Sequence, residues 1–340
     1  MDYIGIDISM EHFHASKFDP KTNQYQVKEW TCITETDLSV FANSLDKTND
    51  WCVMEATGNY HFSLAYWLVE HGFQVSIINP LLVKRYRQMK GSITKTDKAD
   101  AIFIAKYAQS ESDTLSLFQI PSESLIKLSQ RRMLLNSLQN QIQVIDNQIH
   151  ALKYHPKADV YTKDFFEQNQ LSLKSQILSV KQSISELIDQ DYSQQKDLLL
   201  SIPGFGEVTS NAFIETVNTF DGIQKNNATK AFAKFVGLAP TIEHSGKSVR
   251  KQATIARSSC PLLRTKLYLP AITVCTRTKT SNIFKTFYIK LRANGKSFKE
   301  AIVAVMHKMV RVAITLIKTN TKFNPNFYSP DQPLICAETK

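Results

Sequence analysis

The chain has 340 residues, enough for two or three domains, and its hydrophobic content of 43% and charged content of 21% are those of a globular protein. No apolar run reaches about 18 residues, so we expect no membrane span. No basic segment precedes an apolar one near Met1, so we expect no secretory signal. The five scattered cysteines, never at a Cys-x-x-Cys spacing, predict reduced thiols in a cytoplasmic protein and no zinc site.

The net charge of +10 comes from the last part of the chain. Residues 201–340 contain 21 lysines and arginines against seven acidic residues. Residues 1–110 contain 11 against 13, and residues 111–200 contain nine against 11. Such an asymmetry predicts that the C-terminal part binds nucleic acid. A basic surface that serves solubility alone is the alternative.

The first part of the chain predicts a mixed sheet with helical cover. Apolar runs at residues 2–9 and 51–55 have the length of strands, and residues 12–18 and 25–31 flank the turn sequence DPKTN. Apolar residues at helical spacing predict one helix before residue 51 and one after it, and a further strand follows at 73–78. The order is three strands, helix, strand, helix, strand and then helices, which is that of an RNase H-like domain.

Four acidic residues lie at the ends of these elements. Asp7 interrupts an apolar strand, Glu55 ends the run WCVME, and Asp97 and Asp100 are three apart in KTDKADA, on one face of a helix if that segment is helical. Neighbouring carboxylates repel one another unless a cation lies between them, and hard cations such as Mg²⁺ take oxygen ligands. We therefore predict a site for two Mg²⁺ or Mn²⁺ ions of the phosphoryl-transfer kind. A strand-edge cap, a loop acid and a solvated helix start are the alternative interpretations.

Two heptad patterns predict a pair of long helices. The six apolar positions of the first follow steps of 3-4-3-4-3, and the five of the second follow steps of 4-3-4-3. We expect an antiparallel helical hairpin or a coiled-coil stalk that pairs subunits, with two ordinary bundle helices as the alternative. The positions are Leu135, Leu138, Ile142, Ile145, Ile149 and Leu152, and then Leu173, Ile177, Val180, Ile184 and Leu187.

The sequence of the last part of the chain predicts a mainly helical region. From Leu198, the sequence LLLSIPGFGEVTSNAFIETV places a Pro-Gly-x-Gly turn between two helical stretches and resembles a helix-hairpin-helix. Backbone N–H groups around Gly204 and Gly206 could approach a phosphate there, although many such turns serve geometry alone. Further helices are predicted at residues 228–236, 261–275, 281–293 and 297–318, and the segment from Asn320 has no clear periodicity.

An aromatic and basic stretch precedes the paired aspartates. Lys84, Arg85 and Arg87 surround Tyr86, a composition suited to a nucleic-acid backbone. A solvated helix face explains the same residues equally well.

Three histidines are weaker candidates. His12 and His14 are two apart on a predicted strand and could share one face as metal ligands, but no other His or Cys cluster accompanies them. A surface strand is therefore the favoured interpretation. His307 lies within an apolar helical run and is interpreted as a hydrogen-bonded helix residue.

Several motifs together point to one family. The stretches GIDIS, MEATGNY with a downstream NP, KTDKADA, SIPGFG, FVGLAP, and EHSGK followed by LLR span roughly residues 1–318. With these motifs the chain resembles the transposases of insertion-sequence family one-ten, which include pilin-gene invertases. The resemblance implies an α/β plus α fold with four parts: a RuvC-like Asp-Glu-Asp-Asp domain at 1–120, a coiled-coil linker at 121–197, a helical transposase domain at 198–325 and a tail at 326–340.

The resemblance also implies roles for individual residues. The four acids would hold divalent metal, and Ser245 of EHSGK would attack a DNA phosphate and become joined to the strand. This sequence departs from the family in IARSSCPLLR, where Ser259 stands in the place of a common glycine, so Ser258 and Ser259 are rival nucleophiles. The candidate nucleic-acid contacts are Lys84, Arg85, Arg87, Gly204, Gly206, Lys247, Arg250, Lys251 and Arg264.

The resulting hypothesis is a DNA recombinase that mobilises its own insertion sequence through a serine–DNA intermediate aided by Mg²⁺. The resemblance further implies a structured non-coding guide RNA, a dimer or tetramer formed through the coiled coil, and a bacterial cytoplasmic, nucleoid-associated location. A site-specific invertase of the same family, a RuvC-type nuclease that uses water, and a DNA-binding scaffold are the alternatives. An actin-like sugar kinase is disfavoured because Ile8-Ser9-Met10 supplies no glycine for a phosphate loop.

Overall fold

The computed structural model describes residues 1–56, 58–91, 96–220, 227–241, 244–245, 249–250, 254–255 and 261–325, with the backbone alone between 240 and 261. It divides into two compact units, Met1–Pro121 and Ser122–Lys340. Each unit has hydrophobic cores of its own. No helix in the described part is long and apolar enough to cross a membrane.

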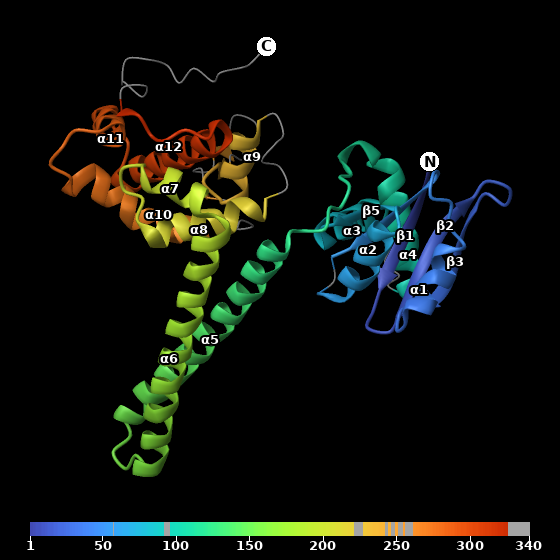
Figure 1. Ribbon diagram of the computed structural model, residues 1–340, viewed down its shortest axis with the longest axis horizontal. Helices are drawn as coiled ribbons and strands as arrows, with labels where there is room; N and C mark the ends of the chain where they lie inside the picture. Colours follow the sequence, from blue (N-terminus) through green and yellow to red (C-terminus); the bar gives the residue numbers. More distant parts are fainter. Residues whose placement is uncertain are drawn as a thin grey trace. The chain divides into compact units, whose positions relative to one another are not determined.

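The first unit is built on a five-stranded mixed sheet with the order β3-β2-β1-β4-β5 (Figure 1). The strand β2 is antiparallel to both of its neighbours, β1 and β3, whereas β1, β4 and β5 run parallel. This confirms the predicted mixed sheet, and the order is that of an RNase H-like domain. The strands are β1 (Asp2–Ile8), β2 (His12–Asp19), β3 (Gln24–Thr31), β4 (Asp50–Glu55) and β5 (Gln74–Ile78).

Helices cover both faces of this sheet. On one face, α1 (Glu35–Ala42) and α2 (Tyr60–Glu70) pack over the side chains of Ile4, Ile6 and Phe13. On the other, α3 (Pro80–Met89) and α4 (Asp97–Ser110) pack over Val53 and Ile78. Side chains alternate along a strand, so Gly5 and Asp7 of β1 point to the face that carries α4. A short 3₁₀ turn, Ser112–Thr114, follows α4.

The second unit begins with the two predicted long helices. The helices α5 (Glu123–Lys153) and α6 (Val160–Asp191) pack side by side within the chain (Figure 1). Ser122 caps the start of α5 and Asp159 that of α6, each by accepting a hydrogen bond from a backbone N–H. Buried positions of the two heptad patterns include Leu135, Leu138, Ile149, Leu173, Ile184 and Leu187.

The remainder of the second unit is mainly helical, as predicted. The central helix α12 (Phe298–Thr319) is apolar around much of its surface and buries ten residues, among them Val305, Met309 and Ala313. The other helices pack around it and around the base of the hairpin. They are α7 (Ser193–Leu200), α8 (Glu207–Asn218), α9 (Ala228–Phe235), α10 (Pro261–Ile272), a π-helical turn (Thr273–Arg277), α11 (Ile283–Ala293) and α12 (Phe298–Thr319).

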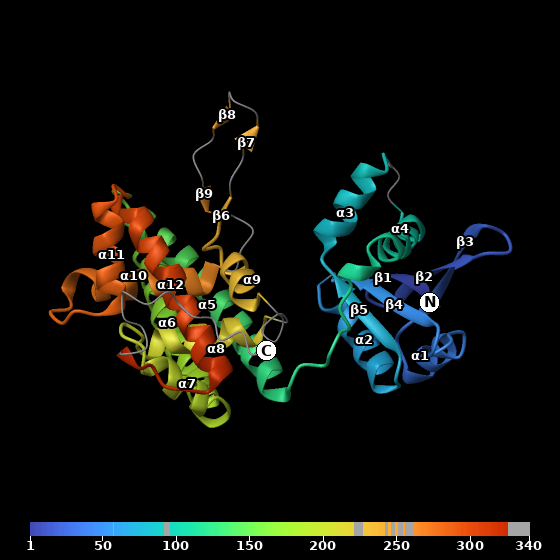
Figure 2. The same ribbon diagram turned by 90° about the horizontal axis from the view of Figure 1, so that it is seen from above.

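One feature of this unit was not predicted. Two short antiparallel ladders interrupt the helices, β6 (Pro240–Thr241) with β9 (Thr254–Ile255), and β7 (His244–Ser245) with β8 (Val249–Arg250) (Figure 2). Strands of two residues carry too little period-2 pattern to be recognised in a sequence.

Among the described residues, Cys32, Cys52 and Cys275 are free thiols. Burial raises the pKa of Cys275 to about 11, which makes this thiol a poor nucleophile. Cys260, Cys336 and the predicted tail at 326–340 lie outside the description.

Candidate active site

The four acidic residues come from three elements of the first unit. Asp7 lies near the carboxyl end of β1 and Glu55 at that of β4, and Ile6 is paired with Met54 between the two strands. Neighbouring parallel strands end at the same edge of a sheet, so both carboxylates belong to that edge. Asp97 and Asp100 occupy the first turn of α4, which is helical as expected.

A glycine brings α4 onto the strand that carries Asp7. A Cβ on Gly5 would fall 2.2 Å from the carbonyl oxygen of Ala101 and 2.3 Å from the backbone nitrogen of Ala105. The helix therefore lies directly on the backbone of β1. Thr96 caps its start by accepting a hydrogen bond from the N–H of Ala99, which fixes Asp97 and Asp100 in the first turn.

The electrostatics of Asp7 reflect this convergence. The pKa of Asp7 is raised to about 7, first by burial and then by the negative charges of Asp100, Asp97 and Glu55, while Arg87 lowers it. All three other carboxylates are thus near enough to oppose the ionisation of Asp7. The sequence predicted the four residues individually, and the structure brings them into one electrostatic cluster.

The donor set of this cluster fits a hard divalent cation, because it consists of carboxylate oxygens whose mutual repulsion a cation relieves. Among the described residues, however, no three His, Cys, Asp or Glu side chains lie close enough together to hold a metal ion as they stand.

Arg87 lies in this cluster instead of projecting from α3 as a nucleic-acid contact. Its guanidinium forms an ion pair with Asp100, and the two side chains are only 16% and 17% exposed. The guanidinium carbon also lies 4.9 Å from the centre of the Phe103 ring. The Arg87 Nε is buried and makes no hydrogen bond to the described part of the chain.

The neighbours of Arg87 on α3 differ from one another in accessibility. Lys84 and Arg85 are exposed, so both can reach a nucleic-acid backbone. Tyr86 is 9% exposed and packs against Tyr107 at the edge-to-face angle of 83°. Its ring therefore belongs to the core and is not available for stacking with a base.

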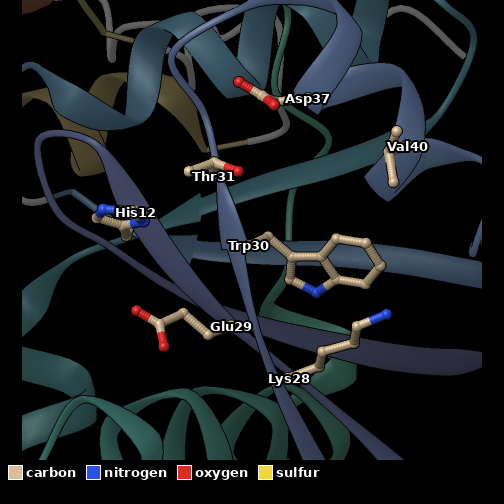
Figure 3. A pocket seen from close by; sticks show the side chains of 7 residues that line it. All are labelled: His12, Lys28, Glu29, Trp30, Thr31, Asp37 and Val40. Atoms are coloured by element: carbon tan, nitrogen blue, oxygen red, sulfur yellow. The ribbon is translucent and has the colours of Figure 1, made fainter.

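The histidine pair lies on the neighbouring strand. His14 is directly opposite Asp7 in the β1–β2 register, and His12 is opposite Thr31 of β3. His12 lines a pocket at the outer strand, which contains none of the four acids (Figure 3). Its other lining residues are Lys28, Glu29, Trp30, Thr31, Asp37 and Val40. His307 of α12 is partly buried, and burial lowers its pKa.

The candidate nucleophile belongs to the unpredicted hairpin. Ser245 is the last residue of β7 and pairs with Val249 of β8. The side chains of Ser245 and Arg250 lie outside the described part of the chain, as do Lys247, Lys251, Ser258 and Ser259. Their predicted roles stay predictions.

The two glycines of the SIPGFG turn have different surroundings. Gly204 has φ of +89°, and a Cβ there would fall 2.5 Å from the Val274 Cγ2 atom. Gly206 is the N-cap of α8 with φ of −107°, and a Cβ there would meet no described atom within 4 Å. Packing thus accounts for Gly204, whereas the backbone at Gly206 is open to a ligand.

Arg264 also has a structural partner. Its guanidinium Nη1 donates a hydrogen bond of 3.4 Å to the carbonyl oxygen of Gly237, in the GLAP turn after α9. Gly237 has φ of +73°, a left-handed conformation that favours glycine. The two motifs GLAP and LLR are therefore joined in space.

Comparison with known proteins identifies the family. A model described as "Transposase", of the DEDD type of IS110, matches residues 4–153, and a model described as "Transposase IS116/IS110/IS902 family" matches residues 196–288. The chain belongs to the IS110 family of transposases. It is therefore an enzyme of DNA strand cleavage and joining, as the motifs predicted.

Curated relatives agree with this assignment. The chain is 29% identical over 331 residues to a pilin gene-inverting protein of Moraxella bovis, which covers 96% of this chain and 98% of that protein. The pilin gene-inverting protein of Moraxella lacunata matches equally well. An uncharacterised 43.6 kDa protein of insertion element IS110 from Streptomyces coelicolor is 27% identical over 40% of this chain and 31% of its own length.

Among solved structures, RuvC of Thermus thermophilus is similar at 14% identity, with 35% of this chain and all of that chain covered and a TM-score of 0.24. A complex of the same protein with a Holliday junction gives 13% identity, 35% and 99% coverage and the same TM-score. The strand order β3-β2-β1-β4-β5 by itself gives the first unit its RNase H-like topology.

Proposed function

We propose that this transposase exchanges DNA strands by attack of a serine hydroxyl on a DNA phosphate, assisted by Mg²⁺ or Mn²⁺ at the acidic cluster. The observation that carries the metal site is the placement of Asp7 and Glu55 at one edge of the sheet, with Asp97 and Asp100 in the first turn of the helix that rests on β1. Bound there, a divalent cation would neutralise charge on the transferring phosphate.

In this proposal the acids and the serine have separate tasks. Asp7, Glu55, Asp97 and Asp100 hold the cation and orient it toward the phosphate. The Ser245 Oγ forms a bond to phosphorus while the bond from phosphorus to the leaving sugar oxygen breaks. The serine gives up its proton and the leaving oxygen takes one up, so no net proton is consumed. The energy of the phosphodiester is conserved for rejoining.

A covalent-capture experiment tests the nucleophile. The full chain is incubated with end-labelled DNA carrying the element ends, denatured, and analysed for label bound to protein. We expect labelled protein from the wild type and none from Ser245→Ala. Ser258→Ala and Ser259→Ala are the matched controls and should keep the label. If only one of these two variants loses it, that serine is the nucleophile.

The same experiment separates the transposase from a RuvC-type nuclease. A nuclease that uses water releases cleaved DNA and leaves no label on the protein.

Substitution of the acids distinguishes both enzymes from a DNA-binding scaffold. The Asp7→Asn variant should retain DNA binding, while its rate of cleavage should fall by about two orders of magnitude or more, the order of the loss when one catalytic electrostatic contact is removed. Cleavage that survives in Asp7→Asn contradicts the metal site.

A site-specific invertase is the second candidate function. It is favoured by the pilin gene-inverting proteins, which match over 96% of this chain. A plasmid with inverted sites and a plasmid with an intact element distinguish inversion from excision and insertion. The genomic flanks add independent evidence, because a structured transcribed segment beside the gene is expected for an RNA-guided element.

Guide RNA binding is a further part of the proposal. The basic residues of 201–340 are compatible with it, since positive charge binds either nucleic acid. Ribonuclease treatment of the purified protein before the strand-exchange reaction tests the dependence. Activity that survives complete RNA removal excludes it.

Assembly through the α5–α6 hairpin completes the proposal. Large apolar side chains are exposed along both helices, although each helix already buries a seam against the other. Such a surface favours association with a second copy. Light scattering should give a dimer or tetramer, and polar substitutions at two exposed positions should give a monomer. The exposed side chains include Leu134, Val144, Tyr161, Phe165, Leu171 and Leu178.

A further inference from the structure

We propose that Arg87 is a positioning residue that acts as an internal cation: it holds Asp100 in the metal-free protein and competes with the divalent ion for that carboxylate. The inference rests on the proposed function, because it concerns the metal site proposed above. It assigns to Arg87 a role toward the acids in place of the nucleic-acid contact that its sequence position suggested.

The ion pair between Arg87 and Asp100 is sheltered from water. The two side chains are 16% and 17% exposed, and they join α3 to the first turn of α4. Opposite charges attract more strongly in such surroundings than at an exposed surface. The pair is therefore a partly buried contact between two helices and not an exposed surface ion pair.

The pair also obstructs coordination. The Asp100 Oδ1 atom that accepts from the Arg87 Nη2 atom is a candidate metal ligand, and a guanidinium beside a divalent ion repels it. A divalent ion that takes the Asp100 Oδ1 atom as its ligand must therefore displace Arg87 from it, and an ion on the other oxygen would lie close to the guanidinium charge.

Arg87 has a second contact that does not involve the acids. Phe103 lies three residues after Asp100 on α4, and its ring centre is 4.9 Å from the guanidinium carbon. A planar guanidinium stacks well on an aromatic face. The guanidinium can therefore leave Asp100 and remain on Phe103. Its displacement breaks the ion pair with Asp100 but keeps the contact with the Phe103 ring.

The test is Mn²⁺ binding to the full chain, measured by electron paramagnetic resonance of the free ion, without DNA. Arg87→Gln should lower the Kd for Mn²⁺ by about tenfold or more, the order by which one nearby charge shifts an ionic equilibrium. Arg85→Gln is the matched control, since it removes the same charge from an exposed position of the same helix. Its Kd should stay within about twofold of the wild type, because solvent screens an exposed charge.

A Kd for Arg87→Gln that equals or exceeds that of the wild type overturns the inference while the metal site stands. If neither protein binds Mn²⁺, the metal site of the proposed function fails and the inference fails with it. Binding by Arg87→Gln alone supports both.

Thermal unfolding without metal separates positioning from a purely structural role. Loss of the α3–α4 ion pair should lower the melting temperature of Arg87→Gln even though its Mn²⁺ affinity rises. A lower melting temperature with unchanged affinity is the structural outcome and overturns the inference. If Arg87→Gln does not fold, Arg87→Met replaces it: this side chain has no charge, so Mn²⁺ should bind more tightly than to the wild type, and an equal Kd contradicts the proposal.

Discussion

Gly5 of β1 and Ala101 of α4 are in direct backbone contact, with room for no side chain between them: a Cβ on Gly5 would lie 2.2 Å from the carbonyl oxygen of Ala101. This contact sets the height of α4 above the sheet. It thereby sets the separation between Asp7, two residues along the strand, and Asp100, one residue before Ala101. The geometry of the acidic cluster depends on a residue that contributes no side chain.

Gly5→Ala should therefore damage both stability and activity. Neither backbone can move aside cheaply, so we expect a loss of about 1–3 kcal/mol in the free energy of unfolding from overpacking, measured by urea denaturation. Strand cleavage should also fall in the variant that remains folded, because α4 is displaced. Gly206→Ala is the control for stability alone, because no described atom lies within 4 Å of the added Cβ. Unchanged stability and cleavage in Gly5→Ala would show that the helix can shift freely.

The two glycines of SIPGFG should respond differently to alanine. Gly204 combines φ of +89° with the close approach of Val274, so Gly204→Ala should lose about 1–3 kcal/mol of stability. Gly206→Ala should lose less than about 1 kcal/mol, the order of a changed N-cap. DNA affinity measured on the folded variants separates packing from phosphate contact. A normal stability of Gly204→Ala with weaker DNA binding would reverse our interpretation of this glycine.

Glu215 of α8 should make stability depend on pH. Its side chain is 8% exposed, 3.4 Å from the Arg132 Nε, and burial raises its pKa above 4.5 although Arg132 and Lys266 lower it. The folded state thus binds a proton more readily than the unfolded state, and the stability from this group is present below pH 4.5 and lost as pH rises above it.

We therefore expect Glu215→Gln to gain melting temperature relative to the wild type as pH rises from about 4.5 to 7. Glu207→Gln on the same helix is the control, because its side chain is 73% exposed. A difference between Glu215→Gln and wild type that stays constant over this range would argue against the raised pKa.

Exposure on α3 predicts which basic residues bind DNA. Lys84→Ala and Arg85→Ala should each reduce the slope of log K against log salt by about 0.9, the contribution of one phosphate contact on a duplex. Arg87→Gln should leave that slope unchanged, because Arg87 is paired with Asp100 and only 16% exposed. Fluorescence anisotropy over a series of salt concentrations measures all three. An unchanged slope in both alanine variants would move the DNA contact away from α3.

The structure confirms most of the predicted elements because their signals are local. Strands of the first unit begin and end within one or two residues of the apolar runs, and the long helices follow the heptad positions. Asp97 and Asp100 share the first turn of a helix, as their spacing indicated. The hairpin that carries Ser245 escaped prediction because each of its strands has two residues.

Only some residues of the candidate site could be predicted from local sequence patterns. Asp7, Glu55, Asp97 and Asp100 could be chosen from the sequence because an acid at the end of an apolar strand, or paired at helical spacing, is unusual by itself. Arg87 could not be assigned: on the sequence it is one of several basic residues around Tyr86. Gly5, two residues before Asp7, was the available signal for the close approach of α4. A glycine in a strand does not show by itself which element packs against it.

The sequence by itself determined the family and the candidate residues for its chemistry, because motif spacing and charge are properties of the chain. Only the tertiary structure decided that α4 rests on Gly5, that Asp7 is opposed by three other carboxylates, and that Arg87 faces Asp100 and not solvent. These relationships join residues of different elements, and they depend on strand register and helix height. Packing of the whole unit sets both quantities, and no short stretch of sequence contains them.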